Sequence, residues 1–191
     1  MTLEEAFKGL PTFATDRLRV HPLRESDAEA IFAFNSNPLV TEPYGAEPHG
    51  SLHETERWVK DRLTDYQRRD SMLWVLSPKE KDEAIGSCCY WHFDVESKSA
   101  EVGYELHPEY WHQGLMLEAL APVLAFGFGG IGLHRIEACP LAENKSSNNL
   151  LHKLGFEFEG TLRQRVLFRG RFIDLHYYSL LLGELRPNST A

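Results

Sequence analysis

The sequence is poor in cysteine and has no long apolar run. Its three cysteines, Cys88, Cys89 and Cys139, are too few for the disulfide framework of a small secreted domain. No apolar stretch reaches the roughly 18–20 residues that span a bilayer. The first residues also lack the basic and apolar regions of a signal peptide. We therefore expect a cytoplasmic protein with no membrane partner.

Positive charge is also scarce. The 20 basic side chains are outnumbered by 28 acidic ones, which gives a net charge of −8. Because non-specific nucleic-acid binding needs a basic face, we expect no direct nucleic-acid partner. The acidic balance is compatible with a cationic substrate such as an amine.

The nine histidines lack the spacing of metal ligands. His49 and His53 stand four residues apart, but Gly50 lies between them and Pro48 precedes them. This composition disfavours a continuous helix that would align the two rings. We expect no metal.

Length and composition predict one globular domain. With 42% hydrophobic and 25% charged residues, a chain of 191 residues can bury a substantial core. We expect a leader at residues 1–14, the domain at residues 15–185 and a tail at residues 186–191.

Hydrophobic periodicity and turn residues predict a mixed α/β domain of the α+β type. A helix that follows one middle strand and precedes the next predicts a parallel pair in a mostly antiparallel sheet, flanked by about four helices. Ser51 with Glu54 predicts a capping box, and Gly155 predicts a helix end. We expect strands at 16–22, 71–76, 85–93, 97–106, 134–139, 156–168 and 172–182, helices at 25–34, 51–69 and 146–154, a helix from Gly114 to about Phe128, and a loop at 35–50.

The segment Tyr110–Ala119 carries the strongest functional signal. A predicted strand runs into it, a predicted helix runs out of it, and Gly114 stands at the junction. Unpaired N–H groups and the helix dipole make such a junction suitable for an anion. A plain glycine turn would have the same local sequence. The segment predicts a cofactor with a pyrophosphate, provided that other segments of the sequence also indicate such a cofactor.

Three other segments agree with this interpretation. Together with it they cover about residues 15–183 and resemble the GNAT superfamily of acetyl-CoA-dependent N-acetyltransferases. The resemblance is strongest to the RimJ/RimL-like branch, the ribosomal-protein N-terminal alanine/serine acetyltransferases. The segments are Thr15–Val20 with Asp27-Ala28 and Ile31-Phe32; Ala100–Trp111 with Gly114 and Glu118-Ala119; Gly132–Ala138; and Asn144 with Ser147, Lys153–Phe156 and Glu159-Gly160.

The resemblance implies a GNAT-like domain with a splayed parallel strand pair and acetyl-CoA as cosubstrate. The segment Trp111–Met116 would wrap the pyrophosphate, and Asn144 would hold the pantetheine arm or the local backbone. A backbone N–H near Leu106 or His107 would stabilise the oxyanion. The implied cofactor-binding residues are Leu106, His107, Trp111, His112, Gln113, Gly114, Leu115, Met116, Leu117, Asn144 and Ser147.

The sequence departs from the family pattern at two positions. Met116 stands where the family usually has glycine or alanine, two positions after Gly114. Pro122 lies within the predicted helix, where it removes the bond to the carbonyl of Glu118. These departures motivate a rival interpretation, a non-catalytic acyl-CoA-binding or sensing module on the same fold. A nucleotide-binding protein of another fold is disfavoured, since neither GxGxxG nor a P-loop lysine is present.

Acetyl transfer to an amine requires the amine to be neutral. An α-amine with a pKa of roughly 7.7–8.0 is only about one-tenth neutral at pH 7, so a general base helps. Glu101 and Glu105 lie on one face of their predicted strand. The resemblance places Glu101 at the common acidic position, and we favour it as the base, directly or through water, with Glu105 second. A solvated or ion-paired carboxylate is the alternative for each.

The resemblance also assigns Ser147 a catalytic role, in which it protonates the departing thiolate after direct attack in a ternary complex. Helix capping is the alternative for both Asn144 and Ser147. Cys139 could form an acetyl-cysteine, but packing is the simpler interpretation. We treat His112 and His134 as structural or cofactor-flanking.

The acceptor is expected near the long loop at 35–50, the predicted helix at 51–69 and the segment Tyr90-Trp91-His92. Tyr44 and Trp91 could form the walls of a groove, with Glu105 beside them, although ordinary packing would also explain both rings. The partners are thus acetyl-CoA and an amine acceptor, either a protein N-terminus or a small amine. The oligomeric state stays open, with a homodimer as one option.

Overall fold

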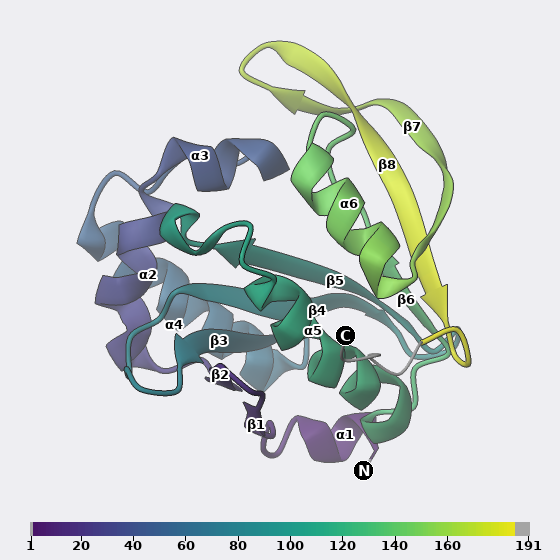
Figure 1. Cartoon of the computed structure of the whole chain (residues 1–191), viewed down its shortest axis with the longest axis horizontal. Helices are drawn as coiled ribbons and strands as arrows, with labels where there is room; N and C mark the ends of the chain where they lie inside the picture. The colour runs from purple at the N-terminus through teal and green to yellow at the C-terminus, as the bar shows by residue number, and fades with distance from the viewer. Residues whose placement is uncertain (1, 186–191) are drawn as a thin grey trace.

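The computed structural model describes residues 2–185, which form one sheet covered by helices on both faces (Figure 1). The sheet has eight strands in the order β1-β2-β3-β4-β5-β6-β8-β7. All neighbouring pairs are antiparallel except β5 and β6. The strands are β1 (Phe13–Ala14), β2 (Leu18–Pro22), β3 (Met72–Pro78), β4 (Gly86–Asp94), β5 (Ser99–Leu106), β6 (Arg135–Ala138), β7 (Glu157–Phe168) and β8 (Arg171–Leu181).

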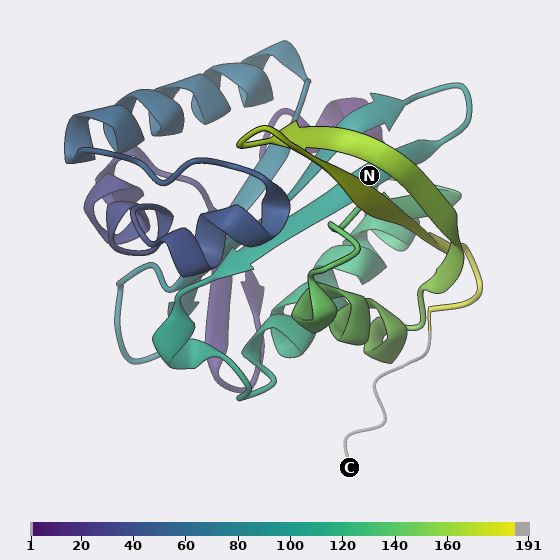
Figure 2. The same cartoon turned by 90° about the horizontal axis from the view of Figure 1, so that it is seen from above.

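The helices form a layer on each face of the sheet (Figure 2). One layer contains α2 and α4, which pack over β3; the other contains α5 and α6. The α-helices are α1 (Leu3–Ala6), α2 (Ala28–Asn35), α3 (Pro38–Thr41), α4 (Leu52–Arg68), α5 (Leu115–Ala125) and α6 (Lys145–Leu154). Shorter turns are η1 (Glu25–Asp27), η2 (Glu42–Tyr44), η3 (Pro108–Tyr110) and the π-helical η4 (Phe126–Gly130). The predicted fold class is confirmed.

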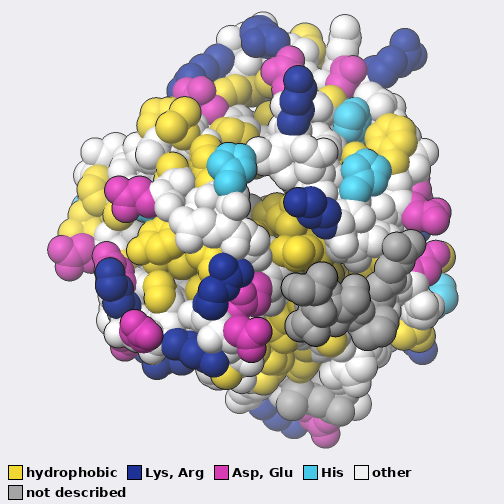
Figure 3. Space-filling model, in the orientation of Figure 1, with side chains coloured by type: hydrophobic (Ala, Val, Ile, Leu, Met, Phe, Trp, Pro, Cys, Tyr) yellow, Lys and Arg dark blue, Asp and Glu magenta, His cyan; other side chains and the backbone are white. Residues whose placement is uncertain are grey.

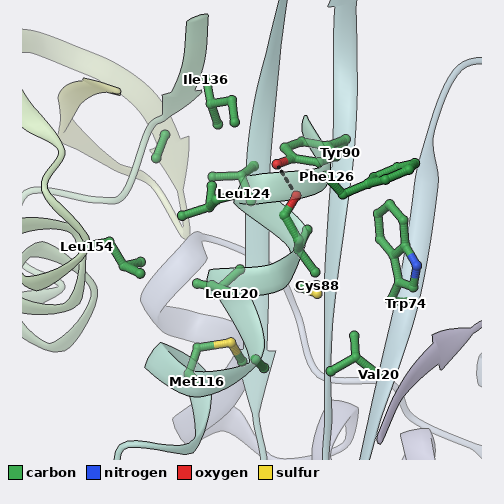
Figure 4. Close-up of a cluster of buried hydrophobic side chains, with 14 of the residues drawn as sticks. Val20, Trp74, Cys88, Tyr90, Met116, Leu120, Leu124, Phe126, Ile136 and Leu154 are labelled. Atoms are coloured by element: carbon green, nitrogen blue, oxygen red, sulfur yellow. Dashed lines mark hydrogen bonds between the residues drawn. The ribbon is translucent and has the colours of Figure 1, made fainter. Parts of the chain in front are cut away.

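The main core lies between the sheet and α5. Met116 and Leu120 of α5 are buried beside Trp74 of β3 and Tyr90 of β4 (Figure 4). The buried Tyr90 hydroxyl donates to the carbonyl of Val123 at 3.0 Å. This bond joins the sheet to α5 at a polar atom that would otherwise be left unsatisfied in the core.

Local sequence signals set several helix ends. The Ser51 side chain accepts from the backbone N–H of Glu54, as predicted, but the Glu54 carboxylate accepts from the N–H of Gly50 rather than Ser51. The reciprocal half of the predicted capping box is therefore displaced by one residue. Gly155 ends α6 with a φ of 91°, a conformation that favours glycine.

Two predicted boundaries were wrong. The segment at 35–50 is not a simple loop, because Asn37 caps α3, whose first residue is Pro38, and η2 follows. The predicted helix to Phe128 is regular only to Ala125 and then widens into η4. Pro122 supplies no N–H to the carbonyl of Glu118, so α5 lacks one bond in its first half.

Much of the segment that we expected as a leader packs onto the domain. Phe13 and Ala14 pair with Val20 and Arg19 of β2, and Ala6 is fully buried. The Tyr66 hydroxyl of α4 donates to the carbonyl of Ala6 at 2.8 Å. The expected tail at residues 186–191 lies outside the described residues. Within residues 2–185, no helix is both long enough and apolar enough to cross a membrane.

Candidate active site

The sheet opens where its parallel pair ends. The pairing of β5 with β6 covers Ser99–Glu101 and Arg135–Glu137, and beyond Glu101 β5 pairs only with β4. On the face shown in Figure 3, a hollow lies near the centre of the molecule, between the start of α5 and α6. The predicted catalytic and cofactor residues come from the elements around this opening.

The loop between β5 and α5 presents a row of free backbone donors. In the described part of the chain, the N–H groups of residues 112–117 donate to no protein acceptor. His112 and Gly114 have left-handed φ values of 60° and 75°, which turn the chain sharply before the first turn of α5. Trp111 fixes the start of the turn, because its Nε1 donates to the carbonyl of Leu106 at 2.7 Å. These donors fit an anion such as a pyrophosphate.

Met116 does not crowd this loop with its side chain. The residue is only 7% exposed, and its side chain lies in the core with Leu120 and Leu124 (Figure 4). Its backbone N–H is free all the same. The departure from the family pattern therefore adds bulk to the core, and the donors of the loop remain available.

At the start of α6, the Asn144 side chain caps the helix, and the Ser147 side chain makes a different contact. The Asn144 side chain accepts from the N–H of Ser147 at 3.1 Å and donates to the carbonyl of Pro43 at 3.1 Å. The cap therefore also attaches α6 to the segment that precedes Tyr44. The Ser147 hydroxyl lies 2.7 Å from the hydroxyl of Tyr104.

Tyr104 was not predicted as a site residue. Its pKa is raised by burial, so the phenol is neutral and can donate a hydrogen bond. The only sequence signal was its position on β5, where it faces away from Glu101 and Glu105.

Glu101 lies at the end of the parallel pair and contacts His92 of the expected acceptor region, a contact that the sequence did not predict. His92 Nδ1 is 3.0 Å from Glu101 Oε2. β4 has one extra residue between Trp91, which pairs with Glu101, and Asp94, which pairs with Ser99. His92 stands in this bulge with a left-handed φ of 49°. The bulge redirects the imidazole to the face that carries Glu101, since a regular strand would turn it to the other face.

Glu105 is brought together with Tyr44. The Tyr44 hydroxyl donates to Glu105 Oε2 at 3.0 Å, and the Ser87 hydroxyl donates to Oε1 at 2.9 Å. Burial raises the pKa of Glu105 and outweighs these hydrogen bonds, which lower it. Burial and the nearby Glu105 carboxylate also raise the pKa of Tyr44. A desolvated carboxyl with two hydroxyl donors is suited to hold a polar group firmly.

Trp91 lies beside this pair on the same face of the sheet. A side chain added at Gly103 would meet its ring at 3.2 Å, and its Nε1 is buried without a hydrogen-bond partner in the described residues. The structure therefore places Tyr44, Trp91 and Glu105 on the side of the sheet that also carries Glu101.

The β7–β8 hairpin extends past the sheet towards α3 (Figure 1). Arg169 at its tip donates to Glu47 at 2.9 and 2.6 Å and to Glu42 at 2.5 Å. Val166 lies close to Gly45, where a side chain would approach its methyl group to 3.5 Å. The hairpin is therefore fastened to the segment that carries Tyr44.

Three other candidates have no role in this geometry. Burial, with Glu101 and Glu137 nearby, raises the pKa of Cys139 to about 12, so the thiol is a poor nucleophile at neutral pH. His134 precedes β6 at the closed end of the parallel pair, and exposed His112 belongs to the loop before α5. In the described chain, no group of three or more acidic, histidine or cysteine side chains is placed to hold a metal.

Known proteins share this architecture. Residues 17–157 match the acetyltransferase (GNAT) domain family. The uncharacterized N-acetyltransferase YoaA of Bacillus subtilis is 36% identical over 171 residues, which are 90% of this chain and 97% of YoaA. The ribosomal-protein-serine acetyltransferase of Escherichia coli is 24% identical over 132 residues, 69% of this chain and 73% of that protein. The structure of RimL, a ribosomal-protein α-N-acetyltransferase in complex with coenzyme A, superposes with a TM-score of 0.82 at 19% identity and covers 90% of this chain and 98% of RimL.

The sheet with its open parallel pair is that of an acetyltransferase (GNAT) domain. This chain belongs to the GNAT acetyltransferase family and is an acetyl-CoA-dependent N-acetyltransferase. The predicted family is confirmed, and the ribosomal-protein acetyltransferases among the relatives support the RimJ/RimL-like branch.

Proposed function

We propose that this enzyme acetylates the N-terminal α-amine of a protein by direct attack of the amine in a ternary complex. One observation carries the proposal. Where β5 leaves β6, Glu101 lies on one face of the sheet, while the Tyr104–Ser147 hydroxyl pair lies on the other. A group between the strands therefore has a proton acceptor on one side and a proton donor on the other.

The fit of acetyl-CoA rests on the loop before α5. The free N–H groups of residues 112–117 match the oxygens of a pyrophosphate, and the helix dipole adds to their field. Asn144 fixes the start of α6, beside which the pantetheine arm would run. When bound, acetyl-CoA supplies the acetyl group as an activated thioester.

Glu101 accepts a proton from the acceptor ammonium, directly or through a water molecule. Its bond to His92 holds one carboxylate oxygen, so the other is free to face the amine. A lysine side chain with a pKa of roughly 10.4 is neutral far less often at pH 7 than an α-amine at roughly 7.7–8.0. Deprotonation of an α-amine by a carboxylate base therefore costs less free energy than deprotonation of a lysine side chain.

Ser147 supplies a proton to the departing sulfur. Its hydroxyl donates only if another group balances the charge that develops on its oxygen, and the neutral Tyr104 phenol at 2.7 Å can do so. The backbone N–H groups near Leu106 and His107 are candidates for the oxyanion site, although the N–H of His107 already donates to the carbonyl of Ile85 at 2.7 Å. Leu106 is therefore the better candidate of the two.

The acceptor lies between the segment that carries Tyr44 and the β7–β8 hairpin. Tyr44 and Trp91 form its walls, and the carboxyls of Glu101 and Glu105 favour a cationic group. A ribosomal-protein-serine acetyltransferase among the relatives supports a protein N-terminus, whereas a spermidine N(1)-acetyltransferase at the same 24% identity supports a small amine as the alternative. The three free cysteines of the structure support a cytoplasmic location.

The test is an acceptor panel with thiol release from acetyl-CoA as the signal. Peptides with a free N-terminus are compared with the same peptides blocked by an N-acetyl group and with polyamines. We expect turnover with free peptides alone. Turnover with polyamines alone would replace the proposed acceptor by a small amine. Tight coenzyme A binding without any turnover would support the non-catalytic module, the motive for which is weakened by the buried side chain of Met116.

A further inference from the structure

A carboxylate lies in the first turn of the helix that would bind the pyrophosphate. Glu118 is held by the segment before β2, more than 100 residues earlier in the chain. Its Oε1 accepts from the Thr15 hydroxyl at 2.5 Å and from the backbone N–H of Arg17 at 2.8 Å. Its Oε2 accepts from Nε and Nη2 of Arg17, both at 2.7 Å. Both oxygens of this carboxylate are thus occupied by donors of the segment before β2.

The same arginine also holds the loop itself. Nη1 of Arg17 donates to the carbonyl of Gln113 at 2.9 Å. The Gln113 side chain in turn donates to the carbonyl of Glu109 at 2.9 Å. Arg17 is fixed to the sheet because its own carbonyl accepts from the N–H of Lys79 at 3.0 Å. Two loop carbonyls are therefore occupied by side chains, while the N–H groups of residues 112–117 stay free.

The contacts of Arg17 with the Gln113 carbonyl and with the Glu118 carboxylate both affect how well the loop can bind an anion. If the peptide between Gln113 and Gly114 turned over, a carbonyl oxygen would replace an N–H in the row of donors and repel a phosphate. Gly114 makes that turn easy, since its left-handed φ of 75° is one of several conformations open to glycine. An uncompensated Glu118 carboxylate in the first helical turn would also compete with the anion for the helix dipole.

We propose that Arg17 is a positioning residue for acetyl-CoA. Its guanidinium, with Glu118, forms a latch that holds the Gln113 carbonyl away from the pyrophosphate and neutralises the carboxylate beside it. The latch is closed before the cofactor arrives, so the loop is preorganised for the anion. This inference rests on the proposed cofactor site in the loop before α5.

The planar fork of arginine is what the latch requires, because three nitrogens act at once on two acceptors. A lysine keeps the charge but offers one nitrogen, which cannot reach the Glu118 carboxylate and the Gln113 carbonyl in the same way. Arg17→Lys therefore separates geometry from charge. Arg24→Lys is the matched control. Arg17 directly precedes β2, whereas Arg24 follows β2 and pairs with Asp82, away from the loop.

The first readout is made without cofactor. Amide hydrogen exchange of peptides that cover residues 110–118 should be faster in Arg17→Lys than in the wild type and unchanged in Arg24→Lys. The protected amides in this range are those of Tyr110, Trp111 and Glu118, whose N–H groups donate to carbonyls at the two ends of the loop. The second readout is the dissociation constant of coenzyme A by calorimetry, which should rise about tenfold or more for Arg17→Lys because charge-assisted hydrogen bonds are lost. Unchanged exchange together with unchanged affinity would overturn the latch.

The third readout excludes a general structural defect. With acetyl-CoA, the KM of Arg17→Lys should rise while kcat changes little. With S-acetylpantetheine, which lacks the pyrophosphate, kcat/KM should equal that of the wild type. Equal losses with both donors would contradict a positioning role. If wild-type protein binds no coenzyme A, the proposed function fails, whereas the exchange experiment still decides whether Arg17 holds the loop.

Discussion

The hydroxyl groups of Tyr104 and Ser147 lie 2.7 Å apart and join β5 to α6 where the sheet opens. Both residues lie on the side of the sheet opposite Glu101. The Ser147 backbone N–H is already capped by Asn144. The serine hydroxyl therefore does not cap the helix, although its position suggested that it would. In the proposed mechanism this hydroxyl donates its proton to the departing thiolate.

Removal of this hydroxyl should slow the chemical step. We expect Ser147→Ala to lower kcat about 100-fold, in the range of general acid catalysis, with the coenzyme A dissociation constant changed less than about twofold. Tyr104→Phe should lower kcat less. Steady-state kinetics gives kcat, and calorimetry gives the dissociation constant of coenzyme A. Ser146→Ala, one residue away on the exposed face of α6, is the control. If Ser147→Ala weakened binding and left kcat intact, the serine would only hold the cofactor.

Met116→Ala should affect stability and not cofactor binding. Truncation of a buried methionine leaves a cavity in the core and costs about 2–5 kcal/mol of the free energy of unfolding. The backbone donors of the loop are unchanged, so the dissociation constant of coenzyme A should stay within about twofold. Chemical denaturation and calorimetry measure the two effects. Markedly tighter binding by the variant would instead mean that the methionine side chain crowds the cofactor.

Glu105 should make stability depend on pH. Burial raises its pKa in the folded protein above the ordinary glutamate value of about 4.5. As pH rises above 4.5, the unfolded chain therefore loses this proton first, and stability falls until pH passes the folded pKa. Glu105→Gln removes this loss, so the variant should gain stability relative to the wild type as pH rises from 4.5 to the folded pKa of Glu105. Urea denaturation at several pH values gives the difference. A difference that is constant or that shrinks with pH would contradict the prediction.

Arg169 should affect the acceptor and not the cofactor. Its side chain fastens the hairpin to Glu42 and Glu47 beside Tyr44, so Arg169→Ala should raise the KM of a peptide acceptor severalfold. The KM of acetyl-CoA should not change. Arg171→Ala, which removes an exposed pair with Glu143, serves as the control. Equal effects of the two variants on the acceptor would show that the hairpin contact has no specific role.

The local parts of this architecture follow from local sequence. Alternating apolar residues indicated the strands, and Ser51 and Gly155 indicated helix ends, because capping depends on side chains within a few positions. The loop before α5 could be located in the same way, since Gly114 stands between a strand and a helix, and its role in binding the pyrophosphate stays a prediction. The RimJ/RimL-like resemblance added Ser147 and Glu101, to which no local rule assigns a role.

The remaining features depend on contacts between distant residues. Arg17 and Glu118 are 101 positions apart, and Arg169 meets Glu42 over 127 positions. No periodicity encodes such pairs. The contact of His92 with Glu101 was missed for a different reason, because it depends on a bulge that reverses the expected alternation of β4. Tyr104 pairs with Ser147 only because α6 packs beside the open strand.

The most direct test of the account is to locate the transferred acetyl group. A peptide with a free N-terminus and an internal lysine is incubated with acetyl-CoA and either wild-type enzyme or Glu101→Gln, and the product is sequenced by mass spectrometry. We predict acetylation of the α-nitrogen alone by the wild type, and a rate at least about 100-fold lower for Glu101→Gln with coenzyme A affinity preserved. Acetylation of the lysine, or an undiminished rate in Glu101→Gln, would contradict the account.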